Sequence, residues 1–129
     1  MKITHVSAVC RSVENADIFY NKLLRFVKVK DFFIEAELTD KIFGTACRCR
    51  IVAYALDGQE VEVFIPDIFH EERNPFNHVC LEVDDRKSLV AACEDAGVSI
   101  NKISRGDKLL IFINDFDGNM FEIKERVRS

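Results

Sequence analysis

The chain has 129 residues, a length typical of one domain of roughly 100–200 residues. Apolar residues make up 48% of it, which excludes a disordered chain, and no apolar run approaches the ~20 residues that cross a bilayer. With 18 Lys and Arg against 22 Asp and Glu, the formal net charge is −4. Since there is also no basic run, neither nucleic acid nor a membrane is an expected partner.

The first half of the chain predicts a strand, a helix and a second strand. Residues 3–10 combine β-branched residues with alternation, which is typical of a strand. Ser12 is a suitable N-cap for a helix whose apolar residues recur at helical spacing: Val13, Ala16, Phe19, Tyr20, Leu23 and Leu24. Residues 27–34 predict the second strand. Residues 35–46 are less periodic and fit either a short helix or a flap.

A hairpin completes this half. Residues 50–56 and 60–65 predict two strands, and the Asp57-Gly58 pair between them is a strong turn signal. The polar connector 67–77 follows. It contains His70 among acidic residues, where we expect a solvated side chain.

The second half repeats the same order of elements. Residues 76–83 predict a strand, after which Asp84 or Asp85 caps a helix that ends at Gly97. Strands are predicted at 98–103, 108–114 and 120–124, the last two joined by a turn containing Asp117-Gly118. We therefore predict an α+β fold of two βαβββ modules within one domain, 1–129. The first module covers about 1–67, the linker 68–75 and the second module about 76–129.

Residue-by-residue matching supports an internal repeat. His5-Val6 matches His78-Val79 at a separation of 78 − 5 = 73, and Glu62 matches Glu122 at a separation of 122 − 62 = 60. The difference, 13, places about 13 extra residues in the first half, most simply around residues 35–49. Each half thus has one His in its opening strand and one Glu in its closing strand.

These four residues suggest a metal site. Taken singly, a strand His is more often structural and a strand Glu is often solvated. As a repeat-matched set, two imidazoles and two carboxylates suit a divalent ion with open positions for water or substrate oxygens. We therefore predict His5, Glu62, His78 and Glu122 as ligands of Ni, Co, Mn, Fe or Zn.

The same residues resemble the vicinal oxygen chelate superfamily, which includes glyoxalase I, methylmalonyl-CoA epimerase and bleomycin-resistance proteins. The similarity spans essentially the whole chain. It rests on these stretches: His5 with Tyr20-Asn21-Lys22-Leu23-Leu24, Val61-Glu62-Val63, Asn77-His78-Val79, Asp115-Phe116-Asp117-Gly118-Asn119 and Phe121-Glu122-Ile123. It implies paired βαβββ modules that form a curved eight-stranded mixed sheet around a metal.

The resemblance also implies roles. His5, Glu62, His78 and Glu122 match the four metal ligands of glyoxalase I, whereas the family's epimerases tend to have Gln in place of Glu62. Extradiol dioxygenases and fosfomycin-resistance enzymes use a set corresponding to His5, His78 and Glu122, and bleomycin-binding members lack the metal ligands. Glu62 therefore favours a lyase or isomerase. The alternatives are a metal-free binding or resistance protein and an Fe(II) extradiol-type dioxygenase.

Two positions depart from the pattern of enzymes that use glutathione. Val9 stands where these enzymes usually have Arg, and Pro66 stands where they tend to have Asn. Glutathione would lose two polar contacts. The extra segment 35–49, together with Arg48 and Arg50, suggests instead a cover for a different, anionic substrate.

The implied chemistry is proton abstraction next to a metal-chelated carbonyl, either lactoylglutathione-lyase-like or acyl-CoA-epimerase-like. Glu122 is the first choice for the base, and Glu62 is its counterpart on the opposite face. Three phenylalanines are candidates for apolar walls: Phe64, Phe112 and Phe121.

The five cysteines have no framework spacing, and residues 1–5 show no apolar signal segment. We therefore expect reduced thiols and a cytoplasmic location. A small-molecule substrate and a homodimer complete the prediction, with each site formed either within one chain or across the dimer.

Overall fold

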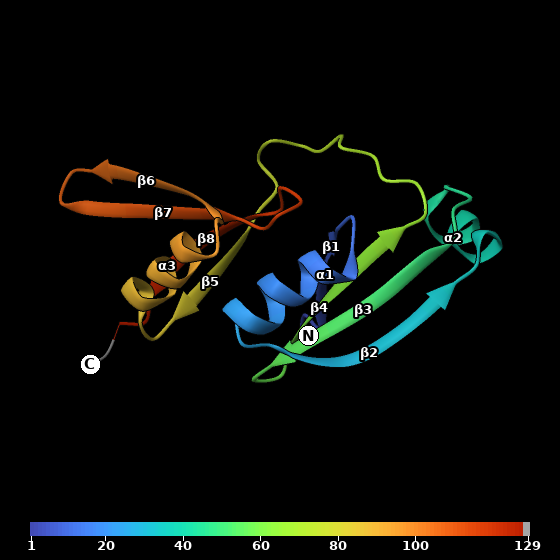
Figure 1. The fold of residues 1–129 in the computed structure, drawn as a ribbon, viewed down its shortest axis with the longest axis horizontal. Helices are drawn as coiled ribbons and strands as arrows, with labels where there is room; N and C mark the ends of the chain where they lie inside the picture. Colours follow the sequence, from blue (N-terminus) through green and yellow to red (C-terminus); the bar gives the residue numbers. More distant parts are fainter. Residues whose placement is uncertain (128–129) are drawn as a thin grey trace. The chain divides into compact units, whose positions relative to one another are not determined.

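A computed structural model describes residues 1–127 of the chain. Its elements follow the predicted order: β1 (His5–Val9), α1 (Val13–Ala16), η1 (Asp17–Leu23), β2 (Val27–Ile34), α2 (Ala36–Phe43), β3 (Cys49–Leu56), β4 (Gln59–Pro66), β5 (Val79–Val83), α3 (Arg86–Asp95), β6 (Ser99–Arg105), β7 (Lys108–Asn114) and β8 (Met120–Glu125). The chain forms two compact units, Met1–Glu71 and Glu72–Ser129. Figure 1 shows both units with the strands and α-helices labelled.

The predicted fold class is confirmed. Each unit is a βαβββ module, and the eight strands form two mixed sheets of four, in the orders β1-β4-β3-β2 and β5-β8-β7-β6. In each sheet the first strand runs parallel to the last, and the other neighbours are antiparallel. Among the described residues, no helix is long and apolar enough to cross a membrane.

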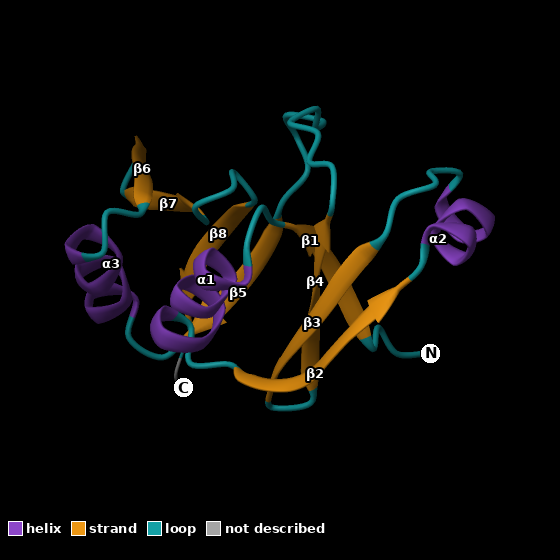
Figure 2. Ribbon diagram, turned by 45° about the vertical axis from the view of Figure 1, so that its right-hand side comes forward, coloured by secondary structure: helices purple, strands orange, loops and turns teal. Residues whose placement is uncertain are grey.

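In the first unit, the helical segment packs against one face of the sheet (Figure 2). The Ser12 side chain accepts a hydrogen bond from the Asn15 backbone N–H at 3.1 Å and so starts the helix as predicted. The helix continues as a π-helix, η1. Its buried Tyr20 stacks on Tyr54 of β3, with ring centroids 5.5 Å apart. Helix and sheet therefore share an aromatic core, and the opposite face of this sheet carries no part of α1 or η1.

The turn at Asp57-Gly58 is the predicted hairpin. Asp57 has φ 51° and Gly58 has φ 77°, the positive values that a type I′ turn requires at both central positions. Residues 35–46, whose sequence fits either a short helix or a flap, contain the helix α2. Thr39 fixes its position, because the buried hydroxyl donates to the carbonyl of Cys47 at 2.7 Å.

In the second unit, α3 packs against β6 and β8, and its buried side chains are Val90 and Cys93. Of the two predicted caps, Asp85 is the one used: its carboxylate accepts from the Ser88 backbone N–H at 3.0 Å. One predicted boundary is wrong. Strand β5 begins at Val79 rather than Phe76, so His78 lies just before the strand, since the chain turns between residues 74 and 77.

Candidate metal centre

Strands β1 and β4 place three donor residues on one face of the first sheet. The parallel register pairs His5 with Glu60 and Ser7 with Glu62, and residues paired in this way point to the same side. Val61 and Val63 alternate to the other face, where both are buried. Glu60 and Glu62 therefore lie on the face opposite to the helix.

The His5 and Glu62 side chains meet directly. His5 Nε2 lies 3.3 Å from Glu62 Oε1, and the donor atoms of His5, Glu60 and Glu62 all lie within 4.8 Å of one another. The Glu62 side chain is 18% exposed, whereas the His5 side chain is 46% exposed. The carboxylate is thus the more buried member of the pair, and the imidazole is the more exposed one.

The second sheet holds His78 and Glu122 on its corresponding face. Glu122 pairs with Cys80 on one side and with Phe112 on the other. His78 Nδ1 lies 2.9 Å from the carbonyl oxygen of Phe76, and its ring meets Phe112 edge-on, with centroids 6.1 Å apart. The Glu122 side chain is 16% exposed, and its Oε2 lies 3.9 Å from Lys124 Nζ.

The strand registers show that the two pairs are equivalent. Glu62 pairs with Ser7, two residues after His5, and Glu122 pairs with Cys80, two residues after His78. The repeat inferred from residue spacing is therefore a repeat of backbone pairing, which gives each module one His and one Glu in the same relation.

A turn at residues 115–119 positions Glu122. The buried Asp115 carboxylate accepts hydrogen bonds from the backbone N–H groups of Asp117 and Asn119 at 2.9 and 2.8 Å, and from the Asn119 side chain at 2.7 Å. Arg73 donates to the carbonyl of Asp117. Residues 115–119 thus form a structural turn that fixes the start of β8.

The donor set of the first module fits a divalent ion. Two ligand atoms that are each about 2.1 Å from an ion, in roughly octahedral arrangement, lie about 3 Å apart. The 3.3 Å between His5 Nε2 and Glu62 Oε1 is close to that spacing. Imidazole with carboxylate is also a mixed donor set suited to Mn, Fe, Co, Ni and Zn.

One sequence-based interpretation requires correction. Phe121 cannot form a wall of the site, because it pairs with Val79 and Ile113 on the helix-covered face and is 3% exposed; Phe64 and Phe112 do lie on the site faces. Arg48 and Arg50 are both paired with carboxylates, Arg48 with Glu35 at 3.0 Å and Arg50 with Asp31 at 2.8 and 2.7 Å, and their role toward an anionic substrate stays a prediction.

One residue of the site escaped the sequence analysis. Glu60 lies beside His5 and Glu62, and its Oε1 is 3.6 Å from Lys30 Nζ. A signal was available, since the repeat aligns Glu60 with Met120 and so marks it as a carboxylate found only in the first half.

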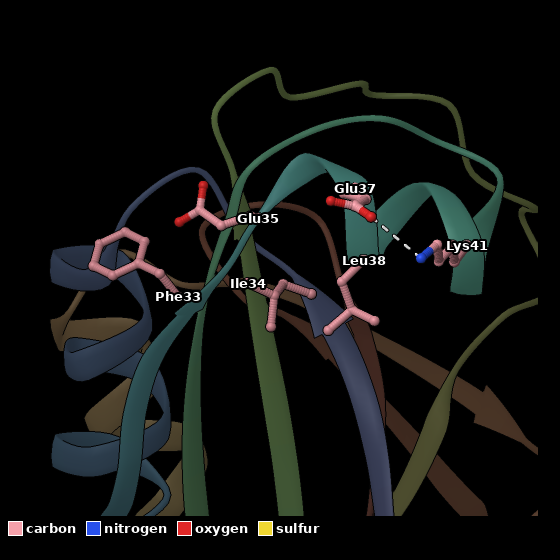
Figure 3. A pocket seen from close by; sticks show the side chains of 6 residues that line it. All are labelled: Phe33, Ile34, Glu35, Glu37, Leu38 and Lys41. Atoms are coloured by element: carbon pink, nitrogen blue, oxygen red, sulfur yellow. Dashed lines mark hydrogen bonds and ion pairs between the residues drawn. The ribbon is translucent and has the colours of Figure 1, made fainter.

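A hollow where β2 meets α2 is separate from these residues. Figure 3 shows its lining: Phe33, Ile34, Glu35, Glu37, Leu38 and Lys41. Lys41 Nζ lies 3.2 Å from Glu37 Oε1, so the charges of that pair are already satisfied. No predicted ligand lines this hollow.

Comparisons with known proteins agree with the fold. Residues 4–112 match the family described as the Glyoxalase/Bleomycin resistance protein/Dioxygenase superfamily, a match that includes His5, Glu62 and His78. A search of curated proteins finds no match.

Several solved structures are similar in fold. A glyoxalase family protein from Enterococcus faecalis is 21% identical, with 95% of each chain covered and a TM-score of 0.71. One from Bacillus cereus is 15% identical over 99% of this chain and 95% of that chain, with a TM-score of 0.79. A mutant of the fosfomycin resistance protein FosX from Listeria monocytogenes, complexed with Mn(II) and 1S,2S-dihydroxypropylphosphonic acid, is 14% identical. That match covers 95% of this chain and 90% of that chain, with a TM-score of 0.70.

Proposed function

The chain belongs to the glyoxalase/bleomycin resistance protein/dioxygenase superfamily, and from this membership we propose that it is a metal-dependent lyase or isomerase. The reaction is removal of a proton next to a carbonyl group of a small-molecule substrate. The observation that carries the proposal is the His–Glu pair that recurs in the same register in both modules.

The proposed ligands are His5, Glu62, His78 and Glu122, holding one Mn, Fe, Co, Ni or Zn ion. Support comes from the 3.3 Å contact of His5 with Glu62, and from the low exposure of both carboxylates. The FosX structure with Mn(II) shows that a protein of this fold can hold such an ion. Each module supplies half of the ligands, from one chain or from two.

When bound, the metal would stabilise the negative charge that develops on a chelated carbonyl oxygen. In this proposal Glu122 accepts the proton from the carbon next to the carbonyl group, and Glu62 is its counterpart, which returns a proton to the opposite face of that carbon. Both side chains are less than one-fifth exposed.

We expect this chain to accept a narrower range of substrates than the superfamily as a whole. Val9 and Pro66 lie on the same face as Glu62, because they share its alternation along β1 and β4. Neither side chain can make the polar contacts expected for glutathione. An acyl-CoA-like or other chelating carbonyl substrate is therefore favoured over a glutathione adduct.

We also propose a cytoplasmic homodimer. All five cysteines are free, and Cys10, Cys49 and Cys93 are buried, which suits a reducing compartment. Burial raises the pKa of the Cys49 and Cys93 thiols to about 11, so that both stay protonated and unreactive.

The first test is metal content. Purified protein is loaded with Mn²⁺, Ni²⁺, Co²⁺, Zn²⁺ or anaerobic Fe²⁺ and analysed for bound metal, together with His78→Ala and Glu122→Ala. We expect about one ion per proposed site in the wild type, and a clear loss in both variants. Glu37→Gln, on the surface of α2, is the matched control and should retain the metal.

The second test is reaction class. The metal-loaded protein is incubated in D₂O with acyl-CoA and hemithioacetal substrates, and exchange of substrate C–H for C–D is followed by mass spectrometry. Full metal occupancy in both ligand variants, or no exchange with any substrate, would contradict the proposal. Ligand binding without metal would favour a sequestering protein, and oxygen consumption with Fe²⁺ would favour a dioxygenase.

A further inference from the structure

A row of polar side chains crosses the site face of the first sheet. Lys30 Nζ lies 3.6 Å from Glu60 Oε1, Glu60 pairs with His5 in the strand register, and His5 contacts Glu62 at 3.3 Å. The Glu60 side chain is 21% exposed, compared with 55% for Lys30. Glu60 is thus the inner, less hydrated member of its ion pair.

The alanines of β3 allow this row to form. Ala55 pairs with Glu60, and Ala53 pairs with both Lys30 and Glu62. Their methyl groups leave space above the sheet, so that Lys30 reaches across β3 to Glu60. A register shift between Lys28 and Lys30 places Lys30 opposite Ala53.

The second module lacks the row although its strands pair at the equivalent positions. Met120 stands in the position of Glu60, Phe112 in that of Ala53 and Asn101 in that of Lys30. The row is therefore specific to the surroundings of His5 and is not required by the βαβββ module.

We propose that Glu60 is a positioning residue: its carboxylate, whose oxygen lies within 4.8 Å of the His5 donor atom, is placed to accept a hydrogen bond from the His5 ring and so to hold that ring toward Glu62, while Lys30 holds Glu60. A His that binds a metal through one ring nitrogen usually donates its other N–H to a carboxylate, carbonyl or water. His5 has two carboxylates beside it. With Glu62 assigned to the metal, Glu60 remains for this second role.

The expected effect of Glu60 on metal binding rests on the proposed function, whereas its expected effect on the tautomer of the His5 ring does not. A surface ion pair with no positioning role would contribute about 0–1 kcal/mol to stability and leave the His5 ring unchanged. An orienting carboxylate instead fixes one tautomer of the ring, and its loss typically weakens metal binding about 10–100-fold.

The main test variant is Glu60→Met, which introduces the residue found at the equivalent position of the second module, Met120. It is compared with Glu60→Gln and Lys30→Met, and Glu37→Gln is the control. The readouts are the ¹⁵N chemical shifts of the His5 ring in metal-free protein at pH about 8, where imidazole is neutral, and Mn²⁺ affinity by calorimetry. His5→Ala identifies the His5 signals. Circular dichroism verifies that each variant is folded.

We expect Glu60→Met to turn one dominant His5 tautomer into a mixture and to weaken Mn²⁺ binding about 10–100-fold. Glu60→Gln should restore part of both properties, because its amide oxygen still accepts a hydrogen bond. Unchanged ring shifts in Glu60→Met would overturn the proposal, whatever the Mn²⁺ affinity. If the wild type binds none of the five metals tested above, the proposed function fails, and the ring shifts still decide the role of Glu60.

Discussion

The two modules share their strand order and the register that places the His and the Glu, and they differ in what surrounds the equivalent His. In the first module, His5 lies in a polar row with Glu60, Glu62 and Lys30, above small side chains of β3. In the second module, His78 lies before the strand, held by a backbone carbonyl and by the edge of Phe112.

This difference separates what the repeat determines from what individual residues add. Strand register determines where the His and the Glu stand, because one pairing pattern recurs at Ser7–Glu62 and Cys80–Glu122. Side-chain size on the neighbouring strand decides whether a further charge can reach them. The site is thus two backbone-equivalent halves, one with a charged environment and one with an aromatic environment.

The largest expected effect is loss of metal from either half. Because each module supplies one His, His5→Ala and His78→Ala should each lose bound metal and activity. If each site joins the first module of one chain to the second module of its partner, mixing the two variants creates dimers with one site free of substitutions. Refolding an equimolar mixture should then restore part of the metal binding, measured as bound Mn²⁺ per chain.

A site formed within one chain gives a different result. Every site in the mixture would then contain one substitution, and no metal binding would return. Mixing His5→Ala with Glu62→Ala, which affects the same module, is the control and should restore nothing under either arrangement.

Much of the fold could be predicted from local signals. The Asp57-Gly58 turn, the Ser12 cap and the Asp85 cap depend on neighbouring residues alone, and the structure has all three, with Asp85 chosen over Asp84. The His and Glu positions followed from the repeat, which needs only residue spacing. These features require no knowledge of how distant segments pack.

The features that the sequence analysis missed have three different causes. The row of Lys30 with Glu60 requires the register of three strands and the shift at Lys28. The start of β5 at Val79, rather than Phe76, depends on the turn before it. The side of the sheet that Phe121 faces could have been inferred from Glu122, since successive strand residues alternate.

The second expected effect concerns the cores under the two helices. Phe19 is fully buried and meets Tyr20 edge-on, with centroids 4.9 Å apart. Phe19→Ala should lower the free energy of unfolding of the first module by about 3–5 kcal/mol, because a large cavity replaces the ring. Both tyrosines, Tyr20 and Tyr54, lie in this module and the chain has no Trp, so tyrosine fluorescence during urea unfolding reports on it alone.

Ile123 provides the matched change in the second module. It is fully buried, and Ile123→Ala should cost about 2–5 kcal/mol there. Alkylation of Cys93, which is buried in the same module, detects its unfolding by mass spectrometry. If Phe19→Ala moves both transitions equally, the modules unfold as one unit. An unchanged fluorescence midpoint would contradict the role of Phe19 in the core.

A smaller effect is expected at the start of the first helix. Ser12→Ala removes the acceptor for the Asn15 backbone N–H and should cost about 1 kcal/mol, measured by urea unfolding. Ser12→Asp keeps an acceptor and should retain most of that stability. Equal losses in the two variants would show that the serine hydroxyl has another role.

The smallest expected effect is the pH dependence of one ion pair. The Arg50 guanidinium donates two hydrogen bonds to Asp31 and holds the pKa of that carboxyl below its usual value. A lowered pKa in the folded state means that the stabilisation is present above about pH 3.9, the usual Asp pKa, and is lost as the pH falls through the folded value.

Asp31→Asn should therefore be less stable than wild type by about 0.2–1 kcal/mol at neutral pH, since both side chains are about one-third exposed, and the difference should shrink as the pH falls through the pKa of Asp31 in the folded protein. Urea unfolding at several pH values measures it. Glu82→Gln in the second module is the comparison, and it should change stability less, because Arg126 Nε lies 3.5 Å from Glu82 Oε1 and also contacts Asp84. A difference between Asp31→Asn and wild type that does not shrink as the pH falls would mean that Asp31 acts by packing rather than by charge.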